Sequence, residues 1–122
     1  MPLPATFSPI DPAMLASRLA DLRQARRIRL DDAETAALVA ALDGVFADRV
    51  DLFGSRTVPS ARGGDIDVLV LASGAPQDIA RTVRCRFFAA CEEKIDVVVL
   101  DPGALTPVQE AFLSGLDRVR IA

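Results

Sequence analysis

The stretch Phe53-Gly54-Ser55, a nine-residue loop over 56–64, and then Asp65-Ile66-Asp67 leading into Val68-Leu69-Val70-Leu71 decides the fold of this chain. The β-rich segment 49–53 stops at Gly54, and an apolar run follows the two aspartates. This pattern predicts two core strands joined by a loop. Gly54 permits a tight turn with exposed backbone N–H groups, and Ser55 adds a hydroxyl, so the turn is suited to phosphate oxygens.

Three aspartates are the candidate metal ligands. Alternation along the predicted strand 65–71 places Asp65 and Asp67 on one face, about 6.5–7 Å apart, so both can reach one divalent cation or cation pair. Asp96 begins the next apolar run and would join them if the two strands are neighbours in the sheet. At an effective dielectric constant near 20, carboxylates about 6 Å apart repel by roughly 3 kcal/mol, so counter-charge is expected. The alternative is that they are strand-end acids facing water, with Asp96 far from the others.

The remaining sequence predicts a flexible arm over residues 1–10 and a single domain over 11–122. Asp11 followed by Pro12 predicts one helix start, and Asp31 with Glu34 predicts a second through a capping box. We expect the loop 56–64 to be exposed and mobile, because it contains one proline and two glycines. The predicted helices cover about residues 12–24, 32–43, 77–90 and 106–115, and the predicted strands cover 49–53, 65–71, 94–100 and 119–121.

Composition limits the chemistry. The 122 residues are 51% apolar and 25% charged, which indicates a globular chain of one domain, too small for a separate substrate domain. The chain contains no histidine, tyrosine or tryptophan, so a histidine base, a Ser-His-Asp triad and histidine-ligated zinc are excluded. Cys85 and Cys91 are too far apart in sequence for a CxxC metal pair.

Charge and hydropathy bear on partners and location. The net charge of −3 gives no global attraction to nucleic acid, so direct nucleic-acid binding is not expected. Four arginines at 23, 26, 27 and 29 are expected to be a solvated helix end; the alternative is contact with an acidic partner or RNA. No apolar run approaches the roughly 18 residues of a membrane span, and the first residues do not resemble a signal peptide, so we expect a cytoplasmic protein.

Taken together, the Phe-Gly-Ser turn, the Asp-x-Asp strand and the later run Lys94-Ile95-Asp96-Val97-Val98-Val99 resemble the DNA polymerase beta-like nucleotidyltransferase superfamily. The resemblance is greatest to its minimal nucleotidyltransferases and covers about residues 32–122. It implies an α+β fold, with a mixed β-sheet flanked by helices.

The resemblance also implies roles for particular residues. In that family, residues matching Asp65, Asp67 and Asp96 are catalytic and hold two Mg²⁺ ions, and the residue matching Asp96 helps to deprotonate the attacking hydroxyl. Residues like Gly54 and Ser55 hold the phosphates of ATP or another nucleoside triphosphate. We expect Arg56, and less so Arg62, to neutralise phosphate charge.

Many minimal nucleotidyltransferases resemble this chain in being paired with a small helical HEPN protein, in a toxin–antitoxin module. The resemblance therefore implies an antitoxin that transfers a nucleotidyl group, most simply AMP, to a hydroxyl of that partner. Two alternatives remain open at this stage: a binding module with little turnover that neutralises its partner by complex formation, and a nucleotidyltransferase that acts on a small molecule.

Overall fold

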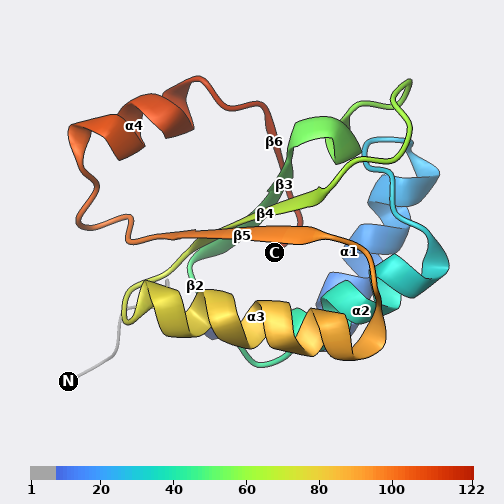
Figure 1. The fold of residues 1–122 in the computed structure, drawn as a ribbon, viewed down its shortest axis with the longest axis horizontal. Helices are drawn as coiled ribbons and strands as arrows, with labels where there is room; N and C mark the ends of the chain where they lie inside the picture. The colour runs from blue at the N-terminus through green and yellow to red at the C-terminus, as the bar shows by residue number, and fades with distance from the viewer. Residues whose placement is uncertain (1–7) are drawn as a thin grey trace.

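A four-stranded sheet lies at the centre of the protein, whose computed structural model describes residues 8–122 (Figure 1). The strand order is β5-β4-β3-β6, where β3 is antiparallel to β4 and β6, and β4 is parallel to β5. The sheet is therefore mixed, and the expected neighbourhood of the two aspartate-bearing strands is confirmed. The strands are β3 (Arg49–Phe53), β4 (Ile66–Leu71), β5 (Ile95–Leu100) and β6 (Arg118–Arg120).

Helices flank both faces of this sheet. Helices α1 (Pro12–Gln24), α2 (Asp32–Leu42) and α3 (Pro76–Ala90) lie on one side, and the short helix α4 (Pro107–Ser114) lies on the other (Figure 1). The expected starts are confirmed: the Asp11 side chain accepts from the backbone of α1, and Asp31 and Glu34 form a reciprocal capping box on α2. The described residues therefore form an α+β fold.

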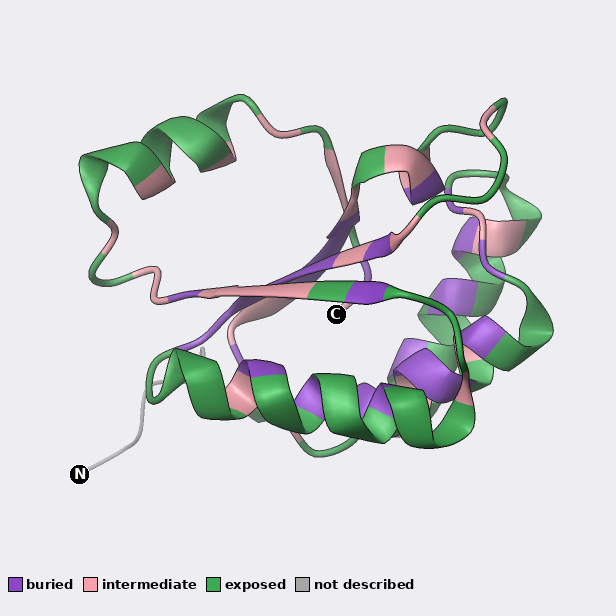
Figure 2. Ribbon diagram, in the orientation of Figure 1, coloured by how far each residue is buried: buried purple, intermediate pink, exposed green. Residues whose placement is uncertain are grey.

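The two faces of the sheet are buried to different degrees. Alternate residues of β4, including Val68 and Val70, belong to the large core beneath α1, α2 and α3. Leu69 and Leu71 point to the other face, where a smaller cluster packs against residues around α4. Helix α4 has no fully buried residue, and Figure 2 shows it almost wholly exposed. Asp67 of β4 shares the face of Leu69, because side chains alternate along a strand.

The structure departs from the expected arm at its start. Residues 1–7 lie outside the described residues, but Ser8–Pro9 form β1, which pairs antiparallel with β2 (Phe46–Ala47). The Ile10 N–H also donates to the Val45 carbonyl at 2.9 Å, and the Ile10 side chain packs against the main core. The ordered domain thus begins before residue 11, since an apolar residue and a short ladder anchor this segment.

Two smaller differences concern the ends of elements. Residues Gly54–Thr57 form a 3₁₀ turn, η1, where the sequence predicts the beginning of a loop. The last strand covers Arg118–Arg120, one residue earlier than expected. None of the helices among residues 8–122 combines the length and apolar character that crossing a bilayer requires.

Candidate functional site

Asp67 and Asp96 lie side by side at the beginnings of two parallel strands. Their residues are direct partners in the register of β4 and β5, so both side chains leave the same face of the sheet. Asp65 precedes Asp67 by two residues and is half-buried. The pKa of Asp67 is raised above its usual range, first by burial, then by the negative charges of Asp96 and Asp65, and also by a hydrogen bond with the Asp96 carboxyl. The structure therefore brings the three predicted carboxylates into electrostatic contact.

Gly54 makes room for the Asp67 carboxylate. Its φ is +74°, a left-handed conformation that favours glycine, and a Cβ atom at this position would overlap Oδ2 of Asp67. Phe53 is the register partner of Asp67 across β3 and β4, which explains why the turn that follows β3 meets this carboxylate. The glycine of the predicted turn thus has a second role: it allows the backbone to approach the acidic pair.

Gly64 makes room for Ser55 in the same way. Its φ is +86°, and a Cβ atom there would overlap the Ser55 hydroxyl oxygen. The two ends of the loop therefore come together, with Ser55 beside the residue that immediately precedes Asp65. This places the hydroxyl expected to bind phosphate next to the segment that carries the aspartates.

The loop between these glycines is anchored by Arg29. Its side chain donates to the carbonyls of Ser55, Val58 and Gly63 at 2.8, 2.9 and 3.0 Å, and its own N–H donates to the Arg56 carbonyl at 2.7 Å. Much of the loop is exposed, as expected, but four hydrogen bonds to one residue constrain it. From the sequence, Arg29 was grouped with solvated arginines of a helix end, since nothing in the local pattern separates it from its neighbours.

Arg56 occupies a different environment from the one expected for a phosphate ligand. It is 5% exposed, and its guanidinium donates to both carboxylate oxygens of Glu34 at 2.8 and 2.9 Å. It also donates to the carbonyls of Gly64 and Arg29. Contact with a phosphate would require breaking this arrangement, so Arg56 is a structural anchor of the loop here. Arg62, on the same loop, is exposed.

Glu34 is the buried counterpart of Arg56. Burial alone would raise the pKa of its carboxyl, but hydrogen bonds from Arg56 and the Asp31 backbone, together with the positive charges of Arg56 and Arg29, outweigh burial and lower it below 4.5. The carboxylate is therefore ionised and paired at neutral pH. The sequence predicted Glu34 only as a capping residue, because a pairing across 22 positions has no local signal.

A second charged group lies farther along the same sheet face. Asp51 is fully buried and accepts from Arg49 at 2.8 Å and from Arg118 at 3.2 Å. Beside it, the ring of Phe53 meets the ring of Phe112 from α4 edge-on, with centroids 6.0 Å apart. Asp51 is thus paired with two arginines, whereas Asp67 and Asp96 bring like charges together. The sequence did not single out either Asp51 or Arg118, because a pairing that spans 67 positions has no local signal.

The donors present suit a hard divalent cation. The three carboxylates offer only oxygen atoms, which Mg²⁺ prefers, and their mutual repulsion is of the kind that a cation relieves. Over residues 8–122, no group of three or more acidic or cysteine side chains is already arranged to hold a metal ion. Asp67 and Asp96 therefore form a close pair, with Asp65 nearby, rather than a complete three-ligand site.

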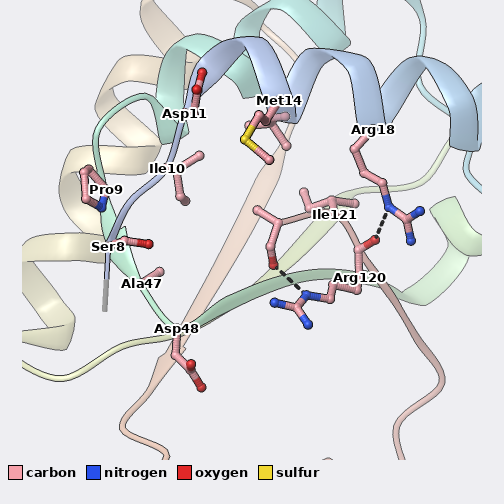
Figure 3. Close-up of a pocket in the computed structure, with 12 residues that line it drawn as sticks. Ser8, Pro9, Ile10, Asp11, Met14, Arg18, Ala47, Asp48, Arg120 and Ile121 are labelled. Carbon is pink, nitrogen blue, oxygen red and sulfur yellow. Dashed lines mark hydrogen bonds between the residues drawn. The ribbon is translucent and has the colours of Figure 1, made fainter. Parts of the chain in front are cut away.

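One cavity lies away from these carboxylates. It encloses about 440 Å³ between α1, β1 and the C-terminal segment (Figure 3). Figure 3 shows Met14 and Ile121 facing it, while Arg18 donates to the Arg120 carbonyl at its rim. Neither the aspartates nor the Gly54–Ser55 turn lines this cavity.

Comparisons with known proteins add no assignment. Neither a model of a known protein family nor a curated protein matches this sequence. The α+β fold and the geometry of the acidic pair are therefore the observations on which a function is argued.

Proposed function

We propose that this protein is a minimal nucleotidyltransferase of the DNA polymerase beta-like type, which transfers a nucleotidyl group, most simply AMP from ATP, to a hydroxyl of a partner protein. The observation that carries the proposal is the pairing of Asp67 with Asp96 on one sheet face, against a glycine turn that continues into Ser55. Parallel strands that present paired carboxylates beside such a turn bring metal and phosphate ligands together.

The three acids and the Gly54–Ser55 turn would have different roles in this reaction. Asp67 and Asp96, with Asp65, would hold Mg²⁺, and bound Mg²⁺ would neutralise charge that develops on phosphoryl oxygens. The Gly54–Ser55 turn offers a hydroxyl and backbone N–H groups to the phosphates. Asp96 is the most exposed of the three acids and lies on an edge strand, so it is the carboxylate best placed to accept a proton from an incoming hydroxyl.

A partner protein as acceptor fits the exposed side of the fold. Within residues 8–122, the sheet face that carries the aspartates is covered by one short helix, α4, which has no fully buried residue. A separate protein, of the small helical HEPN kind that the sequence resemblance implies, would supply the acceptor surface in a toxin–antitoxin pair.

One observation favours a second candidate, a nucleotidyltransferase-like binding module with little turnover. Arg56, which could have neutralised phosphate charge, is bonded to Glu34, and the described acids do not form a complete three-ligand group. Under this candidate the protein neutralises its partner by forming a complex. The two candidates differ in whether the chain binds a metal–nucleotide complex.

Thermal unfolding with Mg²⁺ or Mn²⁺ and ATP tests this difference. A ligand that binds only the native state stabilises it by about 2.7 kcal/mol at 100 times its Kd, so the melting temperature should rise. Asp67→Asn should abolish the rise, whereas Asp117→Asn, which changes an exposed aspartate outside the site, should preserve it. If metal and nucleotide did not change the melting temperature, the proposed nucleotidyltransferase activity would be refuted.

Transfer itself is tested with labelled ATP, Mg²⁺ and the protein encoded by the neighbouring gene. Label on that protein, lost with Asp67→Asn, would support the enzyme. Tight association without label would support the binding module. A protein that gains stability from Mg·ATP but labels only a small molecule would instead indicate the third alternative, a small-molecule nucleotidyltransferase.

A further inference from the structure

Strand β5 forms one edge of the sheet, and its outer side is open. Among residues 8–122, the strand order places β5 beside β4 alone. In Figure 1, β5 lies in front of the other strands, and no segment of the described chain crosses it. An edge strand presents a row of backbone donors and acceptors that can pair with another chain.

The direction of these groups follows from the bonds at the two ends of the β4–β5 ladder. The Ile66 N–H donates to the Lys94 carbonyl at 3.0 Å, and the Ala72 N–H donates to the Leu100 carbonyl at 2.9 Å. Lys94 and Leu100 are an even number of positions apart, so the even-numbered residues of β5 bond to β4. The backbone groups of odd-numbered residues therefore point outward.

The residues of β5 whose backbone N–H and C=O groups point outward are Ile95, Val97 and Val99. Within residues 8–122, their N–H groups make no hydrogen bond to a turn, a loop or a neighbouring element. Their side chains belong to the main core, so the exposed part is the backbone itself. The edge also lacks the usual protections: it contains no proline or glycine, and Asp96 is its only charged residue.

We propose that this edge binds a second copy of the chain, by antiparallel pairing of the two β5 strands about a two-fold axis at Val98. The inference does not depend on the proposed enzymatic function. Antiparallel pairing must join outward-pointing residues to one another, and an axis at Val98 does so by placing Val97 opposite Val99 of the second copy.

The sequence of β5 is self-complementary in this arrangement. Val98 faces Val98, and valine pairs across antiparallel strands are favourable. Asp96 of each copy falls opposite Leu100, so the two acids stay apart. A shift of the axis to Val97 is also allowed by the backbone, but it would place Glu93 opposite Asp101, where like charges oppose each other. Of these two axes, the charge pattern favours the one at Val98.

Sedimentation equilibrium on the full chain tests the inference. We expect a particle of twice the 13.0 kDa chain mass at about 100 µM, where a dimer of micromolar Kd is almost fully formed. Val97→Pro removes an outward N–H that the chain's own sheet does not use, so it should yield a folded monomer. Val97→Thr keeps that N–H and should remain a dimer. A wild-type chain that is monomeric would overturn the inference.

Variants with opposite charges at position 98 test the interface even if Val97→Pro fails to fold. Val98→Lys and Val98→Glu each place like charges opposite one another and should weaken the dimer at least tenfold. An equimolar mixture of the two should restore it as a mixed dimer. Single variants that dimerise as tightly as the wild type, or a mixture that stays monomeric, would show that β5 is not the interface.

Discussion

Two pairs of charged side chains differ in their electrostatics: one includes Arg56 at the start of the loop 56–64, and the other includes Asp67 just after its end. Glu34 and Arg56 carry opposite charges, are each 5% exposed and satisfy one another with two hydrogen bonds. Asp67 and Asp96 carry like charges and face the less buried side of the sheet, and burial together with the charge of Asp96 raises the pKa of Asp67. The first pair stabilises the fold, while the second carries an unfavourable interaction that only a cation or a proton relieves. This difference separates the part of the loop that serves stability from the part that we propose serves function.

Removing Arg56 should produce the largest effect. Arg56→Met leaves the Glu34 carboxylate buried without its counter-charge, a change that costs about 3–5 kcal/mol of unfolding free energy. Arg62→Met alters an exposed arginine of the same loop and should change stability by less than about 0.5 kcal/mol. Urea unfolding of both variants measures the contrast. Equal effects would show that the Glu34–Arg56 pair does not anchor the loop.

Acid should weaken the same pair by a smaller amount, because a protonated Glu34 keeps its hydrogen-bonding oxygens. The pKa of Glu34 in the folded state lies below its ordinary value of 4.5. A lowered pKa contributes stability that is present above 4.5 and is lost as pH falls through the folded pKa. The stability difference between wild type and Glu34→Gln should therefore be constant near neutral pH and shrink below 4.5. A difference that stays constant through this acidic range would contradict the assignment.

Gly54→Ala should affect both stability and the acidic pair. A left-handed conformation costs an L-residue about 1–2 kcal/mol, and the added Cβ would also displace the Asp67 carboxylate. Gly63→Ala is the matched control, since Gly63 has a φ of +59° but no atom within 4 Å of the added Cβ. Both variants should lose stability, and Gly54→Ala should lose at least as much as Gly63→Ala because of the added overlap. Only Gly54→Ala should lose the melting shift with Mg·ATP. Equal shifts in the two variants would show that Gly54 does not serve the carboxylates.

Local patterns were sufficient for most of the fold. The capping box at Asp31 and Glu34, the alternation after Asp65 and the valine run after Asp96 each predicted an element that the structure contains. These signals arise within a few residues, where propensity, capping and periodicity act. The pairing of β1 with β2 was missed, because a two-residue strand that contains Pro9 has no periodicity to detect.

The candidate site was predictable only as a list of residues. Asp67 and Asp96 were singled out by sequence, and the register then showed that they are adjacent. The anchoring roles of Arg29, Glu34 and Arg56 were not predictable, since their bonds span 22 to 34 positions and depend on how α2 meets the loop. An arginine after a Gly-Ser turn can equally well contact a phosphate or a buried carboxylate. Only tertiary packing decides between these two partners.

The smallest effect is expected for the like-charged pair, Asp67 and Asp96. Asp67→Asn removes one of two adjacent like charges, so without metal it should stabilise the protein, by an amount within about 1 kcal/mol as for other partly exposed charge interactions. Asp51→Asn provides the opposite control, because Asp51 is fully buried and bonded to Arg49 and Arg118, and its loss should destabilise. Thermal unfolding in chelator measures both variants. If Asp67→Asn also destabilised the metal-free protein, repulsion within the acidic pair would not be its dominant interaction, and the case for a cation site would lose its electrostatic basis.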